Sequence, residues 1–127
     1  MNLLKNLNIQ TKQVTGDKAV IVIQVSDSIK QPYGIVHGGI NAVLAETAAS
    51  LAANKWLYEQ NRGQISIGLN ITTEHLLPVS SGEIIAIATP LKRGRTIQNW
   101  LVKEFNDDQL TSSSIVTLAN RTKPTTK

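Results

Sequence analysis

The stretch that decides the fold of this chain reads QPYGIVHGGINAVLAETAAS and spans residues 31–50. After its glycine pair, apolar residues recur at i, i+3, i+4 and i+7 for three turns, which predicts an α-helix. The positions between them are mostly alanine, so the helix is small or apolar nearly all round. A helix of this kind is typical of one enclosed by other structure. We expect it to begin near His37–Gly39 and to end at Asn61–Gly63.

Strand patterns lie on both sides of this helix. Residues 17–26 contain a β-branched run that predicts a strand buried on both faces. Residues 3–14 are a weaker strand candidate, joined to it through a turn at residues 15–17. Residues 65–72 alternate between apolar and polar, and further strands are expected at 83–91, 96–105 and 110–119. The order ββαββββ predicts an α+β fold in which an antiparallel sheet curls around one long helix.

The composition is that of a single globular domain. The chain has 127 residues, of which 41% are hydrophobic and 17% charged, so disorder, collagen and coiled coil are excluded. It has no cysteine, which excludes a disulfide framework, a thiol nucleophile and a thiolate zinc site. We expect one domain over residues 1–121, a polar tail over 122–127, and no metal.

The charge pattern argues against nucleic acid as a partner. The net charge is +4, but the cations are scattered apart from Lys92-Arg93-Gly94-Arg95, which is typical of a small anion site. The longest stretch without Lys, Arg or Asp, residues 31–54, contains His37 and Glu46 and is therefore not a membrane span. With no apolar signal segment at the start, we expect a cytoplasmic protein without a membrane partner.

The residues that can carry chemistry lie on and before the predicted helix. The G-x-S-x-G elbow, the P-loop and G-x-G-x-x-G are absent from the sequence. A glycine pair at a helix start lets backbone N–H groups approach an oxyanion at the positive end of the helix dipole. Glu46 lies among small and apolar residues, where burial of a carboxylate is costly and can tune a base. Ser50 follows one turn later on the same face.

Each of these residues also has a purely structural explanation. His37 can cap the helix, Glu46 can be solvated, and the cationic cluster can be an ordinary solvated turn.

Taken together, the His-Gly-Gly motif, Leu44-Ala45-Glu46 and Ser50 resemble the hotdog-fold acyl-CoA thioesterases of the PaaI-like superfamily. The closer resemblance is to the subgroup that hydrolyses hydroxybenzoyl-CoA and dihydroxynaphthoyl-CoA. It continues through residues 68–71, His75 and the turn at 92–98. The resemblance implies a hotdog fold and hydrolysis of an acyl-CoA thioester such as hydroxybenzoyl-, dihydroxynaphthoyl- or phenylacetyl-CoA. Phenylacetyl-CoA-type enzymes carry Asp where this chain has Glu46, which favours the aroyl-CoA subgroup.

The same resemblance implies a role for each candidate residue. Glu46 would act on the thioester carbonyl as nucleophile or as the base that activates water, while the Gly38 N–H polarises that carbonyl. His37 would shape the pocket, Gln31 would contact the thioester, and Ser50 would position Glu46 or the water. Coenzyme A would be part of the substrate, with no separate cofactor. The residues implied in binding it are Gly68, His75, Lys92, Arg93, Gly94, Arg95 and Thr96.

The spacing of Gly38 and Glu46 points to an oligomer. They are eight residues apart, or roughly 12 Å along one helix. Both must lie about 3 Å from one thioester group, so a single helix cannot supply both. We expect each site to combine two chains, in a dimer at minimum and a homotetramer of two dimers in full.

Two other functions remain open. One is hydration of an enoyl thioester on the same fold, with His37 and Glu46 as acid and base. The other is a non-catalytic sensor that binds acyl-CoA stably without releasing thiol.

Overall fold

In residues 2–124, which the computed structural model describes, six strands and one long helix make up most of the chain. The elements are α1 (Leu3–Asn6), β1 (Gln10–Val14), β2 (Ala19–Gln24), the 3-10 helix η1 (Asp27–Ile29), α2 (Gly38–Gln60), β3 (Gln64–His75), β4 (Glu83–Arg93), β5 (Ile97–Asn106) and β6 (Gln109–Thr122).

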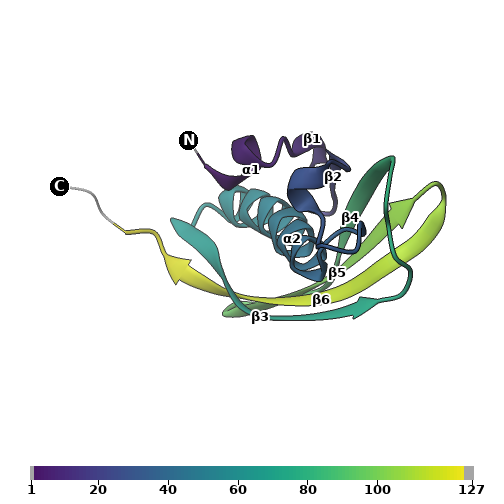
Figure 1. Ribbon diagram of the computed structural model, residues 1–127. Helices are drawn as coiled ribbons and strands as arrows, with labels where there is room; N and C mark the ends of the chain where they lie inside the picture. Colours follow the sequence, from purple (N-terminus) through teal and green to yellow (C-terminus); the bar gives the residue numbers. More distant parts are fainter. Residues whose placement is uncertain (1, 125–127) are drawn as a thin grey trace.

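The strands form one antiparallel sheet in the order β1-β2-β4-β5-β6-β3. The sheet curves around α2, which lies on its concave side (Figure 1). The sheet around one long helix that the sequence predicts is therefore confirmed.

Alanine lets α2 lie close to the sheet. Its buried face carries five fully buried alanines, at positions 45, 48, 49, 52 and 53. Larger side chains from the sheet, among them Ile21, Ile84 and Trp100, fill the space opposite. Packing small residues against large ones lets the helix and the sheet approach each other closely. The helix ends as predicted, because Asn61 takes a left-handed conformation with φ 56°.

The beginning of the chain differs from the predicted strand over residues 3–14. Residues Leu3–Asn6 form the short helix α1, and only Gln10–Val14 is strand. The side chain of Asn2 accepts a hydrogen bond from the Lys5 N–H at 3.2 Å and caps the turn. Asn8, at φ 56°, then turns the chain towards β1. Local capping thus outweighs the apolar pattern.

Three strands are longer than predicted. β4 continues to Arg93, so Lys92 and Arg93 of the predicted turn are strand residues. β3 continues to His75 and contains a bulge between Gly68 and Asn70. β6 includes Thr122, one residue beyond the predicted domain end at 121, and residues 125–127 of the predicted tail lie outside the described residues. Because β3 is at the edge of the sheet, its outer edge has no neighbouring strand among residues 2–124.

Candidate active site

His37 caps the start of α2. Its Nδ1 accepts a hydrogen bond from the Gly39 N–H, and its carbonyl oxygen accepts one from the Ile40 N–H, both at 2.9 Å. The structural explanation of His37 as a cap is therefore confirmed. Among the described residues, no hydrogen bond is recorded for the Gly38 N–H. This group is a free donor at the positive end of the helix.

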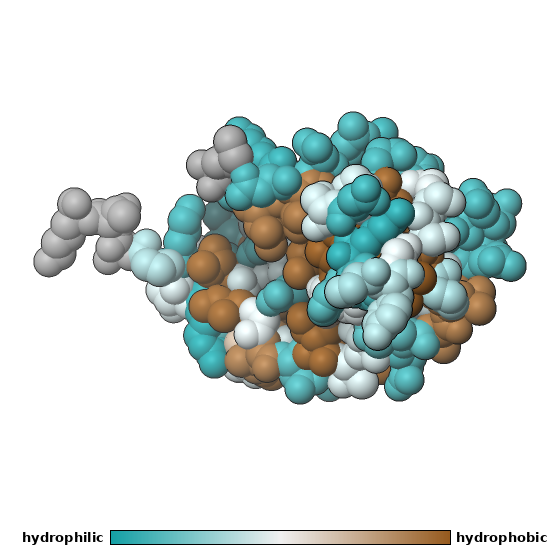
Figure 2. Space-filling view, viewed as in Figure 1, coloured by the Kyte–Doolittle hydropathy of each residue, from teal (hydrophilic) through white to brown (hydrophobic). Residues whose placement is uncertain are grey.

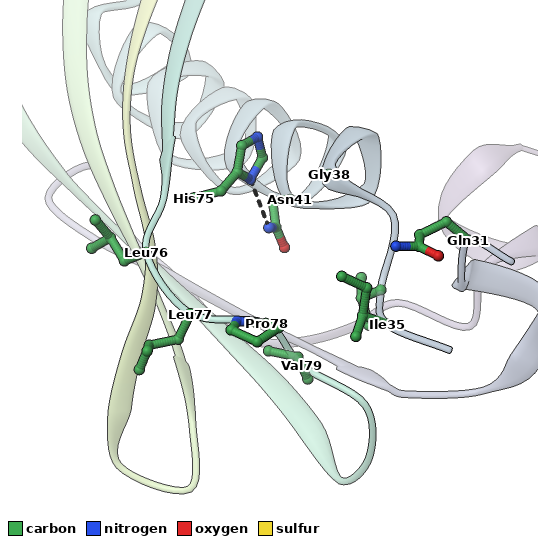
Figure 3. Close-up of a pocket in the computed structure, with 10 residues that line it drawn as sticks. Gln31, Ile35, Gly38, Asn41, His75, Leu76, Leu77, Pro78 and Val79 are labelled. Carbon is green, nitrogen blue, oxygen red and sulfur yellow. Dashed lines mark hydrogen bonds between the residues drawn. The ribbon is translucent and has the colours of Figure 1, made fainter. Parts of the chain in front are cut away.

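A cavity of about 260 Å³ opens beside this free donor, and we call it the N-terminal cavity (Figure 3). Its polar lining comes from Gln31, Gly38, Asn41 and His75, and its apolar lining from residues 35–36 and 76–79. The structure thus places Gln31 and Gly38 in the lining of one cavity. A Cβ atom at Gly38 would lie 3.1 Å from Cε1 of His75, so glycine is what lets the imidazole lie close to the helix.

Glu46 and Ser50 share a second cavity, of about 320 Å³, which we call the Glu46 pocket. Leu4 of α1 and Leu51 of α2 supply its apolar walls. Glu46 is exposed in the single chain, so the expectation that its apolar helix buries it is wrong. The reason is that the sheet covers one flank of α2 and leaves open the flank that carries Glu46. Apolar side chains gather on the face that shows α2 between α1 and β3 (Figure 2).

Gly68 faces the Glu46 carboxylate from across the gap between β3 and α2. A Cβ atom at Gly68 would overlap Oε2 of Glu46. The glycine interrupts an alternating strand and lies at the bulge, which is where a strand admits the close approach of another group. Its position therefore makes room for the Glu46 side chain.

The cationic turn between β4 and β5 is rigidly held. The Asn120 side chain donates hydrogen bonds to the carbonyl oxygens of Gly94 and Arg95, both at 3.0 Å, and its backbone N–H donates to Thr96 at 2.9 Å. Asn120 in turn accepts from Gln98, which accepts from the indole N–H of the fully buried Trp100.

Arg93 is already engaged within the chain. Its guanidinium contacts the Asp17 carboxylate and the Gly16 carbonyl oxygen, each at 2.6 Å, and lies 5.7 Å from the ring centre of Trp56. Lys92 and Arg95 are exposed. Lys92 lies near the end of β4 and Arg95 in the turn itself, and both face solvent.

The cationic turn and the N-terminal cavity are far apart in one chain. His75 pairs with Ser112, which pairs with Glu104 near the end of β5, whereas the turn precedes Ile97 at its beginning. At about 3.3 Å per residue, the distance along β5 is roughly 23 Å.

Glu104 is a buried carboxyl group that the sequence reasoning did not single out. It is fully buried, its two oxygens have no hydrogen-bond partner among the described residues, and burial raises its pKa to about 8. On the same inner row of the sheet, the hydroxyl of Ser112 is also without a partner. The sequence does contain a signal for its burial. Side chains alternate between the two faces of a strand, and Glu104 follows Trp100 and Val102 at a spacing of two, so it lies on the inward face of β5.

Asn41 was also missed. It lies one turn after His37 on α2, and its side chain shares a 3.1 Å hydrogen bond with Nδ1 of His75. No sequence pattern distinguishes it from the polar residues of an ordinary helix.

An antiparallel sheet wrapped around one long helix, with cavities along that helix, defines a hotdog-fold protein. Residues 33–113 match the family model of the thioesterase superfamily, and the chain belongs to this family.

Named relatives and solved structures agree with this family. The chain is 35% identical to a 1,4-dihydroxy-2-naphthoyl-CoA hydrolase from Listeria monocytogenes, over 81% of each protein. It is 32% identical to a proofreading thioesterase, EntH, from Cronobacter turicensis, over 83% of this chain and 74% of that one. The crystal structure of a thioesterase from Haemophilus influenzae matches with a TM-score of 0.87 and 34% identity, covering 94% of this chain and 82% of that one.

The resemblance to hotdog-fold thioesterases is therefore confirmed, and the chain is a thioester hydrolase. In the part of the chain that the structure describes, no helix has both the length and the apolar character to cross a membrane.

Proposed function

We propose that this thioesterase hydrolyses an aromatic acyl-CoA thioester, an aroyl-CoA such as hydroxybenzoyl- or dihydroxynaphthoyl-CoA or the related phenylacetyl-CoA, to the free acid and CoA. The observation that carries the proposal is the Glu46 pocket, in which an exposed carboxylate lies with Ser50 one turn away and the bare backbone of Gly68 opposite. A relative named for 1,4-dihydroxy-2-naphthoyl-CoA supports the aroyl class.

The reaction needs a group that attacks the carbonyl carbon and a donor for its oxygen. On one route Glu46 attacks the carbonyl carbon and expels CoA as thiolate, and water then hydrolyses the resulting anhydride, which frees the acid, restores Glu46 and supplies the proton for the thiolate. On the other route Glu46 takes a proton from an attacking water and passes it to the leaving sulfur. In both routes the carbon–sulfur bond breaks and CoA leaves as the thiol. The Gly38 N–H donates to the oxygen as negative charge builds on it. Gln31 contacts the thioester, His37 holds the helix start in place, and Ser50 positions Glu46 or the water.

The separation of the two cavities supports a site shared between chains. Gly38 lines one cavity and Glu46 the other, on a helix that separates them by roughly 12 Å. We infer that Gly38, Gln31 and His37 of one chain meet Glu46 and Ser50 of a second chain. A dimer is then the smallest active form, and a tetramer of two dimers the expected assembly.

The CoA nucleotide is proposed to bind at the cationic turn. Lys92, Arg95 and the backbone of Gly94 and Thr96 are available to its phosphates, whereas Arg93 holds the turn to Asp17. Gly68 and His75 remain predicted CoA contacts.

The other two functions have less support. Hydration would have to use Nε2 of His37, because its Nδ1 accepts a hydrogen bond from the Gly39 N–H, and the relatives described above are named as thioester hydrolases. A sensor would not need the open space that Gly68 leaves for the Glu46 carboxylate.

Glu46→Gln tests the proposal. It should lower kcat by at least about 10³-fold on aroyl-CoA esters while acyl-CoA binding persists, because it removes the attacking group. Thiol release over a panel of aroyl-, phenylacetyl- and straight-chain acyl-CoA esters measures the loss. Glu83→Gln, an equal change at an exposed carboxylate on β4, should stay within twofold of the parent. Activity of Glu46→Gln within tenfold of the parent would contradict the assignment.

A further inference from the structure

The N-terminal cavity contains a polar group that the proposed reaction does not use. Asn41 is only 8% exposed, and its Oδ1 has no hydrogen-bond partner among the described residues. Figure 3 shows this oxygen pointing into the cavity, away from His75. Buried polar groups are nearly always paired, so an unpaired one that lines a cavity points to a ligand.

The chemistry of the missing partner follows from the amide. Its nitrogen end contacts Nδ1 of His75 at 3.1 Å, which fixes the oxygen end towards the cavity. A carbonyl oxygen is an acceptor only, so the ligand must bring an O–H or N–H donor. Oδ1 itself is covered in the unbound chain, so a donor meets it when the amide turns about its last torsion, which is soft in Asn.

The place of Asn41 indicates which part of the substrate it meets. It lies three residues after Gly38 on the same side of α2, about one turn from the N–H that is proposed to hold the thioester oxygen. The remaining lining, at residues 35–36 and 76–79, is apolar. Apolar walls fit the acyl group better than the amide-rich arm of CoA. A volume of about 260 Å³ is small for a ligand pocket, which favours a ring over a long chain.

We propose that Asn41 is a specificity-determining residue whose Oδ1 accepts a hydrogen bond from a hydroxyl group on an aromatic acyl group. This inference rests on the proposed acyl-CoA hydrolysis and adds to it the residue that selects the acyl group. A site that leaves a buried acceptor unpaired discriminates against the ligand that lacks the donor.

The test compares benzoyl-CoA with 3-hydroxybenzoyl-, 4-hydroxybenzoyl- and 4-methoxybenzoyl-CoA on the parent protein and on Asn41→Leu. The parent should prefer the better hydroxy ester over benzoyl-CoA by at least about tenfold in kcat/KM, and should treat the methoxy ester like benzoyl-CoA. Asn41→Leu should reduce this preference to within about threefold. Asn99→Leu, the same exchange on β5 away from the cavity, should keep the parental preference.

Three results would overturn the proposal. One is equal rates for all four esters in the parent. The second is a preference that survives in Asn41→Leu. The third is an equal loss of kcat/KM on every CoA ester in Asn41→Leu, which would mean that Asn41 only holds His75 or contacts the arm of CoA. If thioesters of N-acetylcysteamine do not show that loss, Asn41 contacts the arm of CoA.

Binding separates a failure of this proposal from a failure of the proposed function. If no ester is turned over, the aroyl-CoA function fails, and calorimetry with the inert analogues phenacyl-CoA and 4-hydroxyphenacyl-CoA still tests Asn41. The parent should bind the hydroxylated analogue at least about tenfold more tightly, and Asn41→Leu should bind both alike. Asn41→Ala replaces Asn41→Leu if the larger side chain prevents folding.

Discussion

Glu46 and Glu104 are two carboxyl groups with opposite surroundings. Glu46 is exposed on the open flank of α2 and faces the bare backbone of Gly68. Glu104 is fully buried, and neither of its oxygens has a hydrogen-bond partner in the part of the chain that the structure describes. A carboxylate must meet a substrate to react, so only Glu46 can act on one. A sealed carboxyl group instead keeps its proton and lowers the stability of the ionised protein. Burial alone is therefore a poor guide to a catalytic carboxylate.

The role given to Glu46 in this comparison depends on Gly38 of a second chain. That role would be wrong if Glu46 and Gly38 of one chain acted together. Glu46→Ala and Gly38→Pro should each lack activity, because the first removes the attacking group and the second the N–H donor. After joint unfolding and refolding, about half of the dimers are mixed by random pairing, and each contains one intact site. Thiol release should return to roughly a quarter of the parental level. Circular dichroism and dimer mass confirm that both variants fold; no recovery from folded, exchanging variants would rule out the shared site.

The variant Glu104→Gln tests the effect of the buried carboxyl group on the unfolding free energy. The pKa of Glu104 is raised to about 8 from its ordinary 4.5, so the unfolded chain loses this proton at lower pH than the folded chain. The contribution of Glu104 to stability is therefore greatest below pH 4.5 and falls as pH rises towards 8, by up to about 1.4 kcal/mol per pH unit.

Between pH 5 and 8 the parent should lose about 3 kcal/mol of unfolding free energy through this group, measured by urea titration. Glu104→Gln should lack that loss while keeping kcat within about threefold. Parallel pH dependences of the two proteins would contradict the assignment of the proton to Glu104.

Gly68→Ala tests whether the open space opposite Glu46 matters. The new Cβ overlaps Oε2 of Glu46 and must displace the carboxylate, which should lower kcat by about 10²-fold with the fold intact. Steady-state thiol release measures the effect. In the double variant with Glu46→Gln, the Gly68→Ala change should add almost nothing. Full additivity would show that Gly68 acts elsewhere.

The smallest effect is expected at the cationic turn. Lys92→Ala with Arg95→Ala should raise KM for aroyl-CoA about tenfold and leave thioesters of N-acetylcysteamine unchanged, because only CoA brings phosphates. The effect should shrink in high salt. Lys12→Ala, at an exposed lysine on β1, is the matched control. Equal changes for both substrate types would assign the turn to the fold alone.

Periodicity made most of the fold predictable. The i, i+3, i+4 pattern gave α2 and the period of two gave β3, because these patterns record which face of an element is buried. The helix α1 was missed because its start depends on one capping side chain, that of Asn2. Helical spacing was enough to place Ser50 with Glu46 in one pocket.

Other features of the site depend on contacts between distant residues. Arg93 contacts Asp17, which lies 76 residues away in the chain, and no local pattern reveals that pair. The exposure of Glu46 depends on which flank of α2 the sheet leaves open. The free oxygen of Asn41 depends on the position of His75 at the end of β3. Such facts follow from the folded arrangement and not from composition or spacing.

The chain has two tryptophans, and the fold gives them separate optical roles. Trp100 is fully buried with its indole N–H bonded to Gln98, so its emission belongs to the interior and changes when the protein unfolds. Trp56 is half-buried under the Arg93 guanidinium, next to the turn proposed for CoA. Replacing each indole by phenylalanine in turn would give one fluorescent reporter for folding and another for occupancy of the turn, without an added dye.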